Sequence, residues 1–369
     1  MIKKYSKVNY VKSTKHVIHL EPSDKLTWYG DKFDATDVTK FWTQDSTLSE
    51  LLPMLDSFNG MFSEQALVLK NNLDLLDELK ALNFDVMIFE SFVLPAYYVL
   101  DYLQIKAFIP CTSITFEDNI LHSIGEPLMP SSVSGPVSQF SDKMSLKERI
   151  INVITPFIFI LLTPKREFKS LRPPHNLVDV ATQESLCSFV FTNSNPYIDF
   201  PRPTLEKNVQ IGGISVDVEE VKKQKLNGKW DDILNLRTQT VLLSFGCRKT
   251  LARTMGKLAD VTFIWKYESD DMDNFAKGIK NIHFFEWVPQ SSLLADPRLS
   301  AFFTHAGLGS INEVSYFGKP AILCPLFADQ MRNAKMLARH NGSIEISKYD
   351  LADSDKLEDV LKKILYDAS

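Results

Sequence analysis

The sequence has few cysteines, and they are not arranged as metal ligands or disulfide partners usually are. Cys111, Cys187, Cys247 and Cys324 lie far apart and form no Cys-x-x-Cys pair. Zinc sites and disulfide frameworks rely on close cysteine spacings, so this pattern argues against both. We expect the four thiols to act as small buried hydrophobic groups. No metal site is predicted.

The chain also lacks a surplus of positive charge. It has 41 lysines and arginines against 46 aspartates and glutamates, which leaves a formal net charge of −5. Domains that bind nucleic acid usually carry a basic excess, so no nucleic-acid partner is expected. The first fifteen residues are basic, but no apolar stretch follows them as it would in a signal peptide.

Long hydrophobic runs are missing as well. The longest one, residues 150–164, contains Pro156 and is shorter than the roughly 20 residues that cross a bilayer. Basic residues flank the run, which leaves contact with a membrane surface open. Burial inside the fold is the favoured interpretation.

What the sequence does have is a regular pattern in its second half. Short runs of β-branched and aromatic residues predict strands buried on both faces, as in a parallel sheet. Segments with apolar residues three and four apart lie between them and predict helices. This alternation predicts a doubly wound α/β domain. The predicted strands are 240–246, 261–268, 281–287, 299–305 and 319–326, and the predicted helices are 312–318, 330–342 and 354–367.

The first half predicts a second α/β unit. Strands are expected at 15–22, 84–91 and 106–113, helices at 64–82 and 97–104, and a surface loop at 123–140. Three prolines and a glycine pair between 191 and 215 indicate a connection between the halves. We therefore predict a first domain over 1–195, a linker over 196–215 and a second domain over 216–369.

Residues 304–313, THAGLGSINE, predict an anion site where a strand turns into a helix. A helix start offers free N–H groups and a positive dipole end, and glycine lets the backbone approach an anion closely. His305 and Ser310 can add donors, and Glu313 can accept from ribose hydroxyls. The two glycines alone are weak evidence, because the third glycine of the dinucleotide fingerprint is missing and a structural turn would explain them.

Two further pairs stand at predicted strand ends. Trp287 can stack on a flat base and Gln290 can bind its polar edge, although a core aromatic is the commoner role for tryptophan. Asp329 and Gln330 suit the hydroxyls of a sugar, although Asp329 could also cap the helix that follows. Both roles of Asp329 can coexist.

Together these residues resemble the donor-site signature of the UDP-glycosyltransferases, the family that includes the UDP-glucuronosyltransferases. The likeness is strongest over WVPQSSLLADPRLSAFFTHAGLGSINEVSYFGKPAILCPLFADQMRNA, residues 287–334, and extends through residues 84–91, 196–203, 209–215 and 260–268. It covers nearly the whole chain and is nearest to nematode-type members. The resemblance implies the GT-B fold, in which two Rossmann-like α/β domains face each other across a cleft, here with an incomplete N-terminal domain.

The resemblance also implies a role for each motif residue. It places Trp287 and Gln290 at uracil, Glu313 at the ribose, and Asp329 and Gln330 at the sugar. It places His305, Gly307 and Ser310 at the diphosphate, and adds Ser244 and Gly246 to the donor side. UDP-sugar is then a co-substrate with no further cofactor. The partner substrate is a small lipophilic acceptor, and the family location is the lumenal side of the endoplasmic reticulum membrane.

Several family features have no counterpart here. The family uses a histidine near its N-terminus as general base, oriented by an acidic residue. The acidic residue corresponds to Glu90, which could otherwise be a solvated carboxylate, but no histidine of this chain fits the other role. Cys247 stands where the family usually has a serine and a loop. The chain therefore looks shortened at both ends, with exposed sheet edges.

Two hypotheses follow. The first is an enzyme that transfers glucuronic acid or glucose from a UDP-sugar to a lipophilic hydroxyl in detoxification. The second is a non-catalytic homologue that binds nucleotide sugar or forms oligomers with complete family members. The missing histidine predicts that this chain alone folds poorly or binds without turnover. A nicotinamide oxidoreductase is a distant third, since it would need the third glycine.

Overall fold

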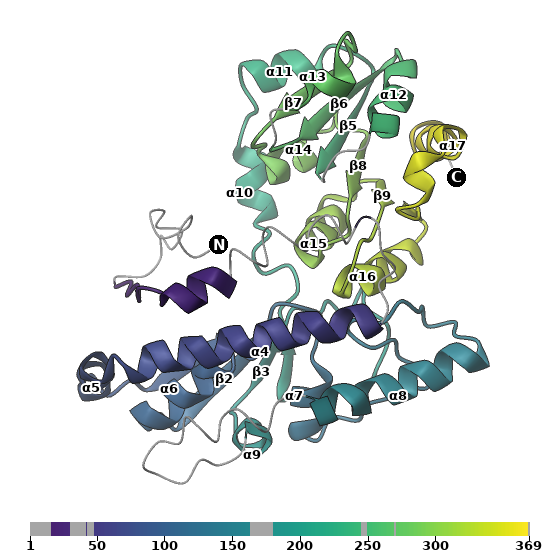
Figure 1. The fold of residues 1–369 in the computed structure, drawn as a ribbon. Coiled ribbons are helices and arrows are strands. Elements are labelled where there is room, and N and C mark those ends of the chain that lie inside the picture. Colours follow the sequence, from purple (N-terminus) through teal and green to yellow (C-terminus); the bar gives the residue numbers. More distant parts are fainter. Residues whose placement is uncertain are drawn as a thin grey trace. The chain divides into compact units, whose positions relative to one another are not determined.

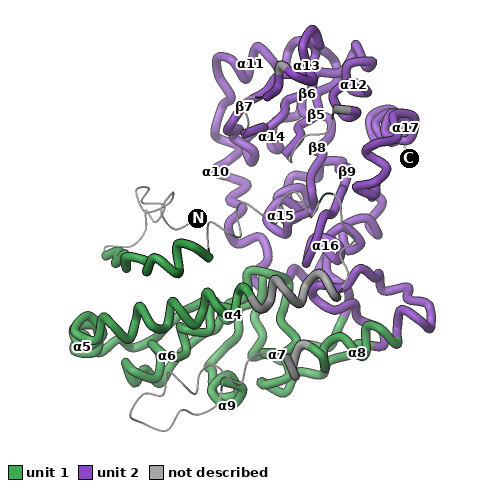
Figure 2. The backbone as a smooth tube through the Cα atoms, viewed as in Figure 1, with its two compact units in different colours: residues 1–130, 150–193, 202–210 green, residues 131–149, 194–201, 211–369 purple. Residues whose placement is uncertain are grey.

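The computed structural model divides the chain into two compact units (Figure 2). Unit 1 comprises residues 1–130, 150–193 and 202–210, and unit 2 comprises residues 131–149, 194–201 and 211–369. The predicted domain limits stay a prediction. The structure describes residues 16–29, 42, 48–162, 180–244, 249–268 and 271–367.

Unit 1 is built on a parallel sheet of four strands in the order β1-β2-β3-β4 (Figure 1). Helix α6 packs on β1, where the rings of Phe89 and Tyr97 lie 4.9 Å apart. The strands expected at 84–91 and 106–113 are confirmed. The strands are β1 Val86–Glu90, β2 Ala107–Thr112, β3 Val190–Thr192 and β4 Asn208–Gln210. The helices are α4 Leu48–Lys70, α5 Leu73–Ala81, α6 Pro95–Leu103, α7 Asp118–Ser123, α8 Leu146–Leu162, of which the first residues belong to unit 2, and α9 Val180–Ser185.

Two predictions for unit 1 were wrong in detail. The helix expected over 64–82 is broken at Asn72, whose side-chain amide donates to the Val68 carbonyl at 2.7 Å. Such a local bond competes with the helical ladder. Residues 16–23 form neither a strand nor a helix, and Val17 and Ile18 are exposed. A short helix follows, and Ser23 caps it by accepting from the Leu26 N–H at 3.1 Å.

Helix α8 forms where the longest apolar run lies, but it is only partly buried. Asn152 and Pro156 face inward, and the Asn152 amide donates to the Pro130 carbonyl at 2.6 Å. Ile150, Ile154 and Phe157 are exposed and lie three or four residues apart, so they share one helix face. The expectation of burial was therefore wrong for this face.

Unit 2 is built on a parallel sheet of six strands in the order β10-β9-β8-β5-β6-β7. A buried cluster between this sheet and its helices includes Leu242, Ile264, Leu293, Phe302 and Ile311. The five predicted strands are confirmed, and β10 was not predicted. The strands are β5 Gln239–Ser244, β6 Val261–Lys266, β7 Ile282–Phe285, β8 Ala301–Thr304, β9 Ala321–Leu323 and β10 Ser343–Glu345.

Helices cover both faces of this sheet (Figure 1). Parallel strands with right-handed crossovers place α12 and α17 on one face and α14, α15 and α16 on the other. The helices expected at 312–318 and 330–342 are α15 and α16, each beginning earlier than expected. The helices are α10 Val218–Lys223, α11 Lys229–Leu234, α12 Lys249–Lys257, α13 Asp273–Ala276, α14 Gln290–Ala295, α15 Leu308–Phe317, α16 Asp329–Ala338 and α17 Ser354–Tyr366, with a 3₁₀ turn at Asp350–Ala352.

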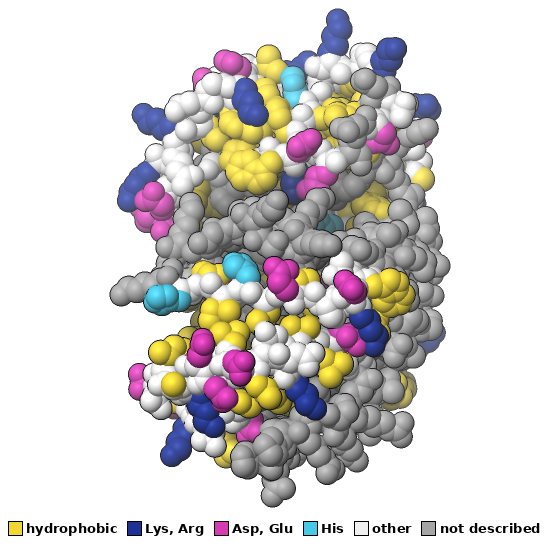
Figure 3. All heavy atoms as spheres, turned by 60° about the vertical axis from the view of Figure 1, so that its left-hand side comes forward, with side chains coloured by type: hydrophobic (Ala, Val, Ile, Leu, Met, Phe, Trp, Pro, Cys, Tyr) yellow, Lys and Arg dark blue, Asp and Glu magenta, His cyan; other side chains and the backbone are white. Residues whose placement is uncertain are grey.

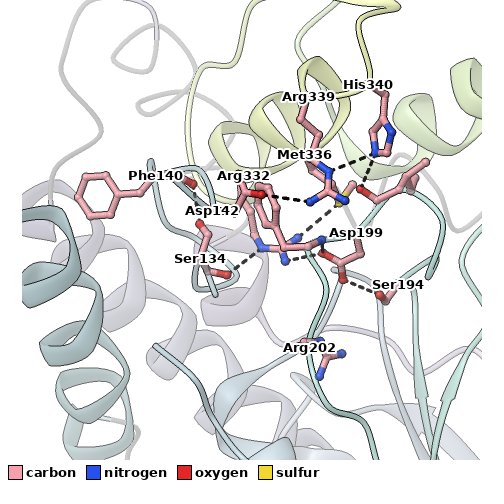
Figure 4. A network of polar contacts seen from close by, with 12 residues as sticks. Ser134, Phe140, Asp142, Ser194, Asp199, Arg202, Arg332, Met336, Arg339 and His340 are labelled. Atoms are coloured by element: carbon pink, nitrogen blue, oxygen red, sulfur yellow. Dashed lines mark hydrogen bonds and ion pairs between the residues drawn. The ribbon is translucent and has the colours of Figure 1, made fainter. Parts of the chain in front are cut away.

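A buried arginine holds distant segments of unit 2 together (Figure 4). Arg332 of α16 is 0% exposed, and its guanidinium bonds the Asp199 carboxylate at 2.5 Å. It also donates to the Ser134 carbonyl at 3.1 Å and lies over the Phe200 ring. The ion pair ties residues 194–201 to α16, and the bond to Ser134 ties residues 131–149 to the same helix.

Candidate functional site

The candidate site begins where two strand ends meet at the centre of the unit 2 sheet. From β5 the chain continues to β6 on one side, whereas from β8 it continues to β9 on the other side. The order in which strands are added to the sheet therefore changes direction between the parallel neighbours β5 and β8. In open α/β sheets, ligands bind beyond the carboxyl ends of the strands at such a switch point. Ser244 ends β5, and His305 directly follows β8. Both predicted residues therefore lie at the position where this fold binds ligands.

The ring of His305 is held between the two strand ends. Its Nδ1 lies 3.3 Å from the main-chain oxygen of Ser244. A carbonyl oxygen only accepts, so Nδ1 carries a proton, and Nε2 of the neutral ring has a lone pair. A Cβ added to Gly307 would lie 3.0 Å from Nε2. Since φ of Gly307 is an ordinary −60°, the close approach of the ring is the reason for glycine here.

Helix α15 starts immediately beyond this ring. Gly307 is its N-cap, and the N–H of Ile311 bonds the Gly307 carbonyl at 3.0 Å. The N–H groups in the first turn of a helix have no carbonyl acceptor within the helix, and the helix dipole makes this end positive. A Cβ added to Gly309 would meet nothing within 4 Å, so open space lies beside the helix start. This geometry suits an anion.

Side chains from α14 and α15 form one polar cluster next to it. The Gln290 amide donates to one carboxylate oxygen of Glu313 and lies 3.3 Å from the Ser310 hydroxyl. The Ser291 hydroxyl donates to the other Glu313 oxygen. The structure therefore brings together Gln290, Ser310 and Glu313, which the sequence assigned to one site. The structure adds Ser291 to this cluster. Its contact with Glu313 depends on how α14 is turned, which the sequence does not indicate.

Trp287 stands between β7 and α14 and is 70% exposed. The alternative of a core aromatic is therefore wrong for this residue. Trp265 of β6 shows what that alternative looks like, since it is 0% exposed. An exposed indole is available to stack on a flat ring.

The acid–amide pair after β9 occupies the first turn of α16. Ala328, not Asp329, is the N-cap, and Asp329 is the first helical residue, so the capping alternative was wrong. The Asp329 carboxylate accepts from the Asn333 amide at 2.7 Å. Gln330 is buried, and its side-chain oxygen accepts from the N–H groups of Leu326 at 2.9 Å and Phe327 at 3.3 Å. This oxygen of Gln330 thus stabilises the turn before α16.

Burial sets the electrostatics of the site. Burial lowers the pKa of His305 below 6.5, while the bond to Ser244 and the charge of Asp329 oppose the shift. Burial raises the pKa of Asp329, and the Asn333 bond opposes that shift. Both shifts follow from the cost of desolvating a charge. The His305 ring is therefore neutral at pH 7.

Glu90, the predicted acidic partner, lies in unit 1 at the end of β1. Ser113, just beyond β2, donates its N–H to Glu90 at 3.2 Å, and its hydroxyl donates to the other oxygen. Both contacts are exposed, so the alternative of a solvated carboxylate at a strand end stays open. Among the residues that the structure describes, the recorded partner of Glu90 is Ser113 rather than a histidine.

A second carboxyl group near Glu90 was missed. The Ser91 hydroxyl lies 3.0 Å from the Cys111 carbonyl and 2.7 Å from Glu117 Oε1. The Ser91 hydroxyl is the donor in both contacts, so its proton is shared between the carbonyl and the carboxylate. Burial raises the pKa of Glu117 to about 8; the Ser91 bond opposes this shift and the charge of Glu90 adds to it. Glu117 is partly exposed, and nothing in the sequence around it indicates this contact.

The remaining sequence predictions concern two undescribed residues, the cysteines, metal ligands and surface charge. Gly246 and Cys247 fall outside the described residues. Among the described cysteines, Cys111, Cys187 and Cys324 form no disulfide bond. The described parts of the chain contain no group of three or more potential metal-ligating side chains. On the face drawn in Figure 3, the described Lys and Arg side chains are interspersed with Asp and Glu and form no continuous basic patch.

Comparisons with known proteins agree on one family. The family described as UDP-glucoronosyl and UDP-glucosyl transferase matches residues 31–369. UDP-glucuronosyltransferase 1-2 of Rattus norvegicus is 26% identical over 346 residues, which is 88% of this chain and 62% of the rat protein. The Caenorhabditis elegans protein ugt-48, named as a candidate UDP-glucuronosyltransferase, is 26% identical over 91% of this chain and 65% of its own length. This chain thus spans less than two thirds of these relatives.

Solved structures share the fold. Os79 of O. sativa, crystallised with UDP, matches with a TM-score of 0.57 and 14% identity, covering 88% of this chain and 78% of that chain. The glycotransferase of kitacinnamycin matches with a TM-score of 0.57 and 15% identity, over the same shares of the two chains. These similarities confirm the GT-B class expected from the sequence, with its two sets of parallel strands.

Proposed function

Because this chain belongs to the family of UDP-glucuronosyl and UDP-glucosyl transferases, as the match over residues 31–369 shows, we propose that unit 2 binds a UDP-sugar and that the protein transfers its hexose to a small lipophilic acceptor. The hexose is glucuronic acid or glucose, and the acceptor group is a hydroxyl, in the manner of a detoxifying enzyme. The UDP-sugar serves as co-substrate.

One observation carries this proposal: the His305 ring and the start of α15 lie together at the switch point of the sheet. The free N–H groups of α15 can bind the diphosphate, and Ser310 can add a donor. Trp287 stacks on the uracil and Gln290 binds its polar edge. Glu313 accepts from the ribose hydroxyls, which compete with Gln290 and Ser291 for its oxygens.

The sugar lies near the exits of β8 and β9 in this proposal. The Asp329 carboxylate accepts from its hydroxyls. Gln330 can contribute only its amide nitrogen while its oxygen bonds Leu326 and Phe327. In the transfer, the acceptor oxygen bonds to the anomeric carbon while the bond from that carbon to the diphosphate breaks. The acceptor proton goes to a base, and UDP leaves with the electron pair, stabilised by the start of α15.

A sugar-transfer assay tests the proposal. The purified chain is incubated with UDP-glucose or UDP-glucuronic acid and a mixture of lipophilic alcohols and phenols, and the products are identified by mass spectrometry. Acceptor carrying one hexose together with an equal amount of released UDP would show transfer and would overturn the expectation that this chain binds without turnover. Calorimetry with UDP and with NAD accompanies the assay. Failure to bind UDP would contradict the proposal, and tighter binding of NAD would favour an oxidoreductase.

A second candidate is a nucleotide-sugar-binding protein without turnover. The contact of Glu90 with Ser113 rather than with a histidine favours it, because the family mechanism needs that base. Among the described strands, β1 pairs only with β2, and the β1 side chains Val86 and Ile88 are exposed. This open edge of β1 supports association with another family member. UDP binding without released product in the same assay would identify this candidate.

The place of action is proposed from two observations. Family relatives are named UDP-glucuronosyltransferases, which supports the lumenal side of the endoplasmic reticulum membrane. The exposed apolar face of α8, beside Lys147 and Arg149, supports contact with a membrane surface. None of the helices in the described residues is long and apolar enough to cross a membrane. Flotation with anionic vesicles, compared between the wild type and a Phe157→Ser variant, tests the contact.

A further inference from the structure

The side chain of Asn333 connects the two strand exits of the donor site. Asn333 is 0% exposed, and its Nδ2 donates to the Asp329 carboxylate at 2.7 Å and to the Ala306 carbonyl at 3.3 Å. Both partners are acceptors, so both amide hydrogens are used and the orientation of the amide is fixed. Ala306 follows His305 beyond β8, whereas Asp329 follows β9. One nitrogen therefore links the turn of the diphosphate site to the carboxylate assigned to the sugar.

The two turns that this amide joins are strained. Ala306 has φ of +65°, and Ala328, next to Asp329, has φ of +53°. L-residues rarely adopt such a backbone, and it persists only where the surroundings hold it in place. Strain of this kind gathers at binding sites, where the backbone must present a neighbouring group at a set angle. The two hydrogen bonds of the Asn333 amide end at Ala306 in the first turn and at Asp329 beside the second turn.

We propose that Asn333 is a positioning residue for the sugar end of the donor, holding the Asp329 carboxylate against the turn that carries His305. This inference rests on the proposed function, because it gives Asp329 a hexose as its ligand. Asn333 itself touches no substrate in this scheme. It acts by fixing the direction in which Asp329 presents its free lone pairs.

The same bond also controls the charge of Asp329. The groups that face this carboxylate are His305 from the β8 exit and Arg332 and Asn333 from α16. Burial raises the pKa of Asp329, and the Asn333 bond is the largest influence that lowers it. Without that bond the carboxyl group takes up a proton at a higher pH. A protonated Asp329 accepts fewer sugar hydroxyls, so sugar recognition should fail first on the acid side.

Calorimetry on the full chain tests the inference. Dissociation constants are measured between about pH 5.5 and pH 8.5 for UDP and for whichever of UDP-glucose and UDP-glucuronic acid the wild type binds more tightly. The variant is Asn333→Ala. The matched control is Asn281→Ala, which removes a buried amide that donates to the carbonyls of Met255, Leu258 and Val261 in the same unit.

We expect Asn333→Ala to leave UDP affinity within about twofold of the wild type and to weaken UDP-sugar binding about tenfold near pH 6, as loss of a hydrogen bond to a charged group does. The deficit should shrink as the pH rises and Asp329 ionises. The control should leave the ratio of the two affinities unchanged at every pH. Asn333→Ser, which keeps a donor, should recover part of the loss and provides the test if the alanine variant does not fold.

Two results would overturn the inference by itself. One is an equal loss of UDP and UDP-sugar affinity at all pH values in the Asn333 variants, which would indicate a structural role only. The other is unchanged UDP-sugar binding at all pH values. A wild-type chain that binds neither nucleotide would instead overturn the proposed function and this inference with it.

Discussion

Replacing Trp287 by alanine should separate binding from stability more clearly than any other single change. The side chain is 70% exposed, so its removal should change the free energy of unfolding by no more than about 0.5 kcal/mol. Stacking of a base on an aromatic ring contributes about 1–3 kcal/mol. That range corresponds to a dissociation constant for UDP that is about 5- to 150-fold higher. The chain should therefore keep its stability and lose most of its affinity.

The assay is calorimetry with UDP and with inorganic pyrophosphate, together with urea unfolding. Pyrophosphate has no base, so its affinity should be the same in the wild type and in Trp287→Ala. Trp287→Phe keeps an aromatic ring and should lose less affinity than the alanine variant. Trp265→Ala is the matched control, because that indole is 0% exposed and its loss should cost about 3–5 kcal/mol of stability.

Two results would contradict this prediction for Trp287. If UDP affinity is unchanged in Trp287→Ala, the indole does not stack on the base. If pyrophosphate affinity falls as much as UDP affinity, Trp287 acts through the shape of the site and not through stacking.

Three further predictions concern unit 2. Arg332→Met leaves the buried Asp199 carboxylate without its ion pair and should cost about 3–5 kcal/mol in urea unfolding, whereas Lys362→Ala on the exposed face of α17 should cause no measurable change. The pKa of His305 in the folded chain is lowered from 6.5, so its contribution to stability is present above that value and is lost as the pH falls below it. Between pH 7 and pH 5 the Tm of His305→Asn should therefore fall less than the Tm of the wild type. An equal fall in Tm would contradict the lowered pKa of His305. Ala328→Gly relieves a φ of +53° and should raise the free energy of unfolding by about 1 kcal/mol, and destabilisation would show that this turn is unstrained.

Much of the unit 2 fold could be predicted because its strands are continuous apolar runs. Residues 241–243 of β5 and 302–303 of β8 are fully buried, and such runs are typical of parallel strands covered on both faces. β10 has only three residues and none is fully buried, so it gives no comparable pattern. The break at Asn72 depends on a side chain competing with the helical ladder, which apolar spacing cannot reveal.

The candidate site divides in a similar way. Gln290, Ser310 and Glu313 belong to a motif with fixed spacing, so their proximity could be expected before the structure was known. Ser291 and Asn333 could not be found in that way, because each acts by bonding a residue from another turn. The burial of Gln330 also depends on how the chain turns after β9, which residue types alone do not specify.

A crystal structure of the chain with UDP tests the central claim most directly. The diphosphate should lie at the N-terminus of α15, between His305 and Ser310, with the uracil against Trp287 and the ribose at Glu313. Uridine diphosphate bound away from the exits of β5 and β8, or a saturated crystal with no nucleotide at α15, would contradict it.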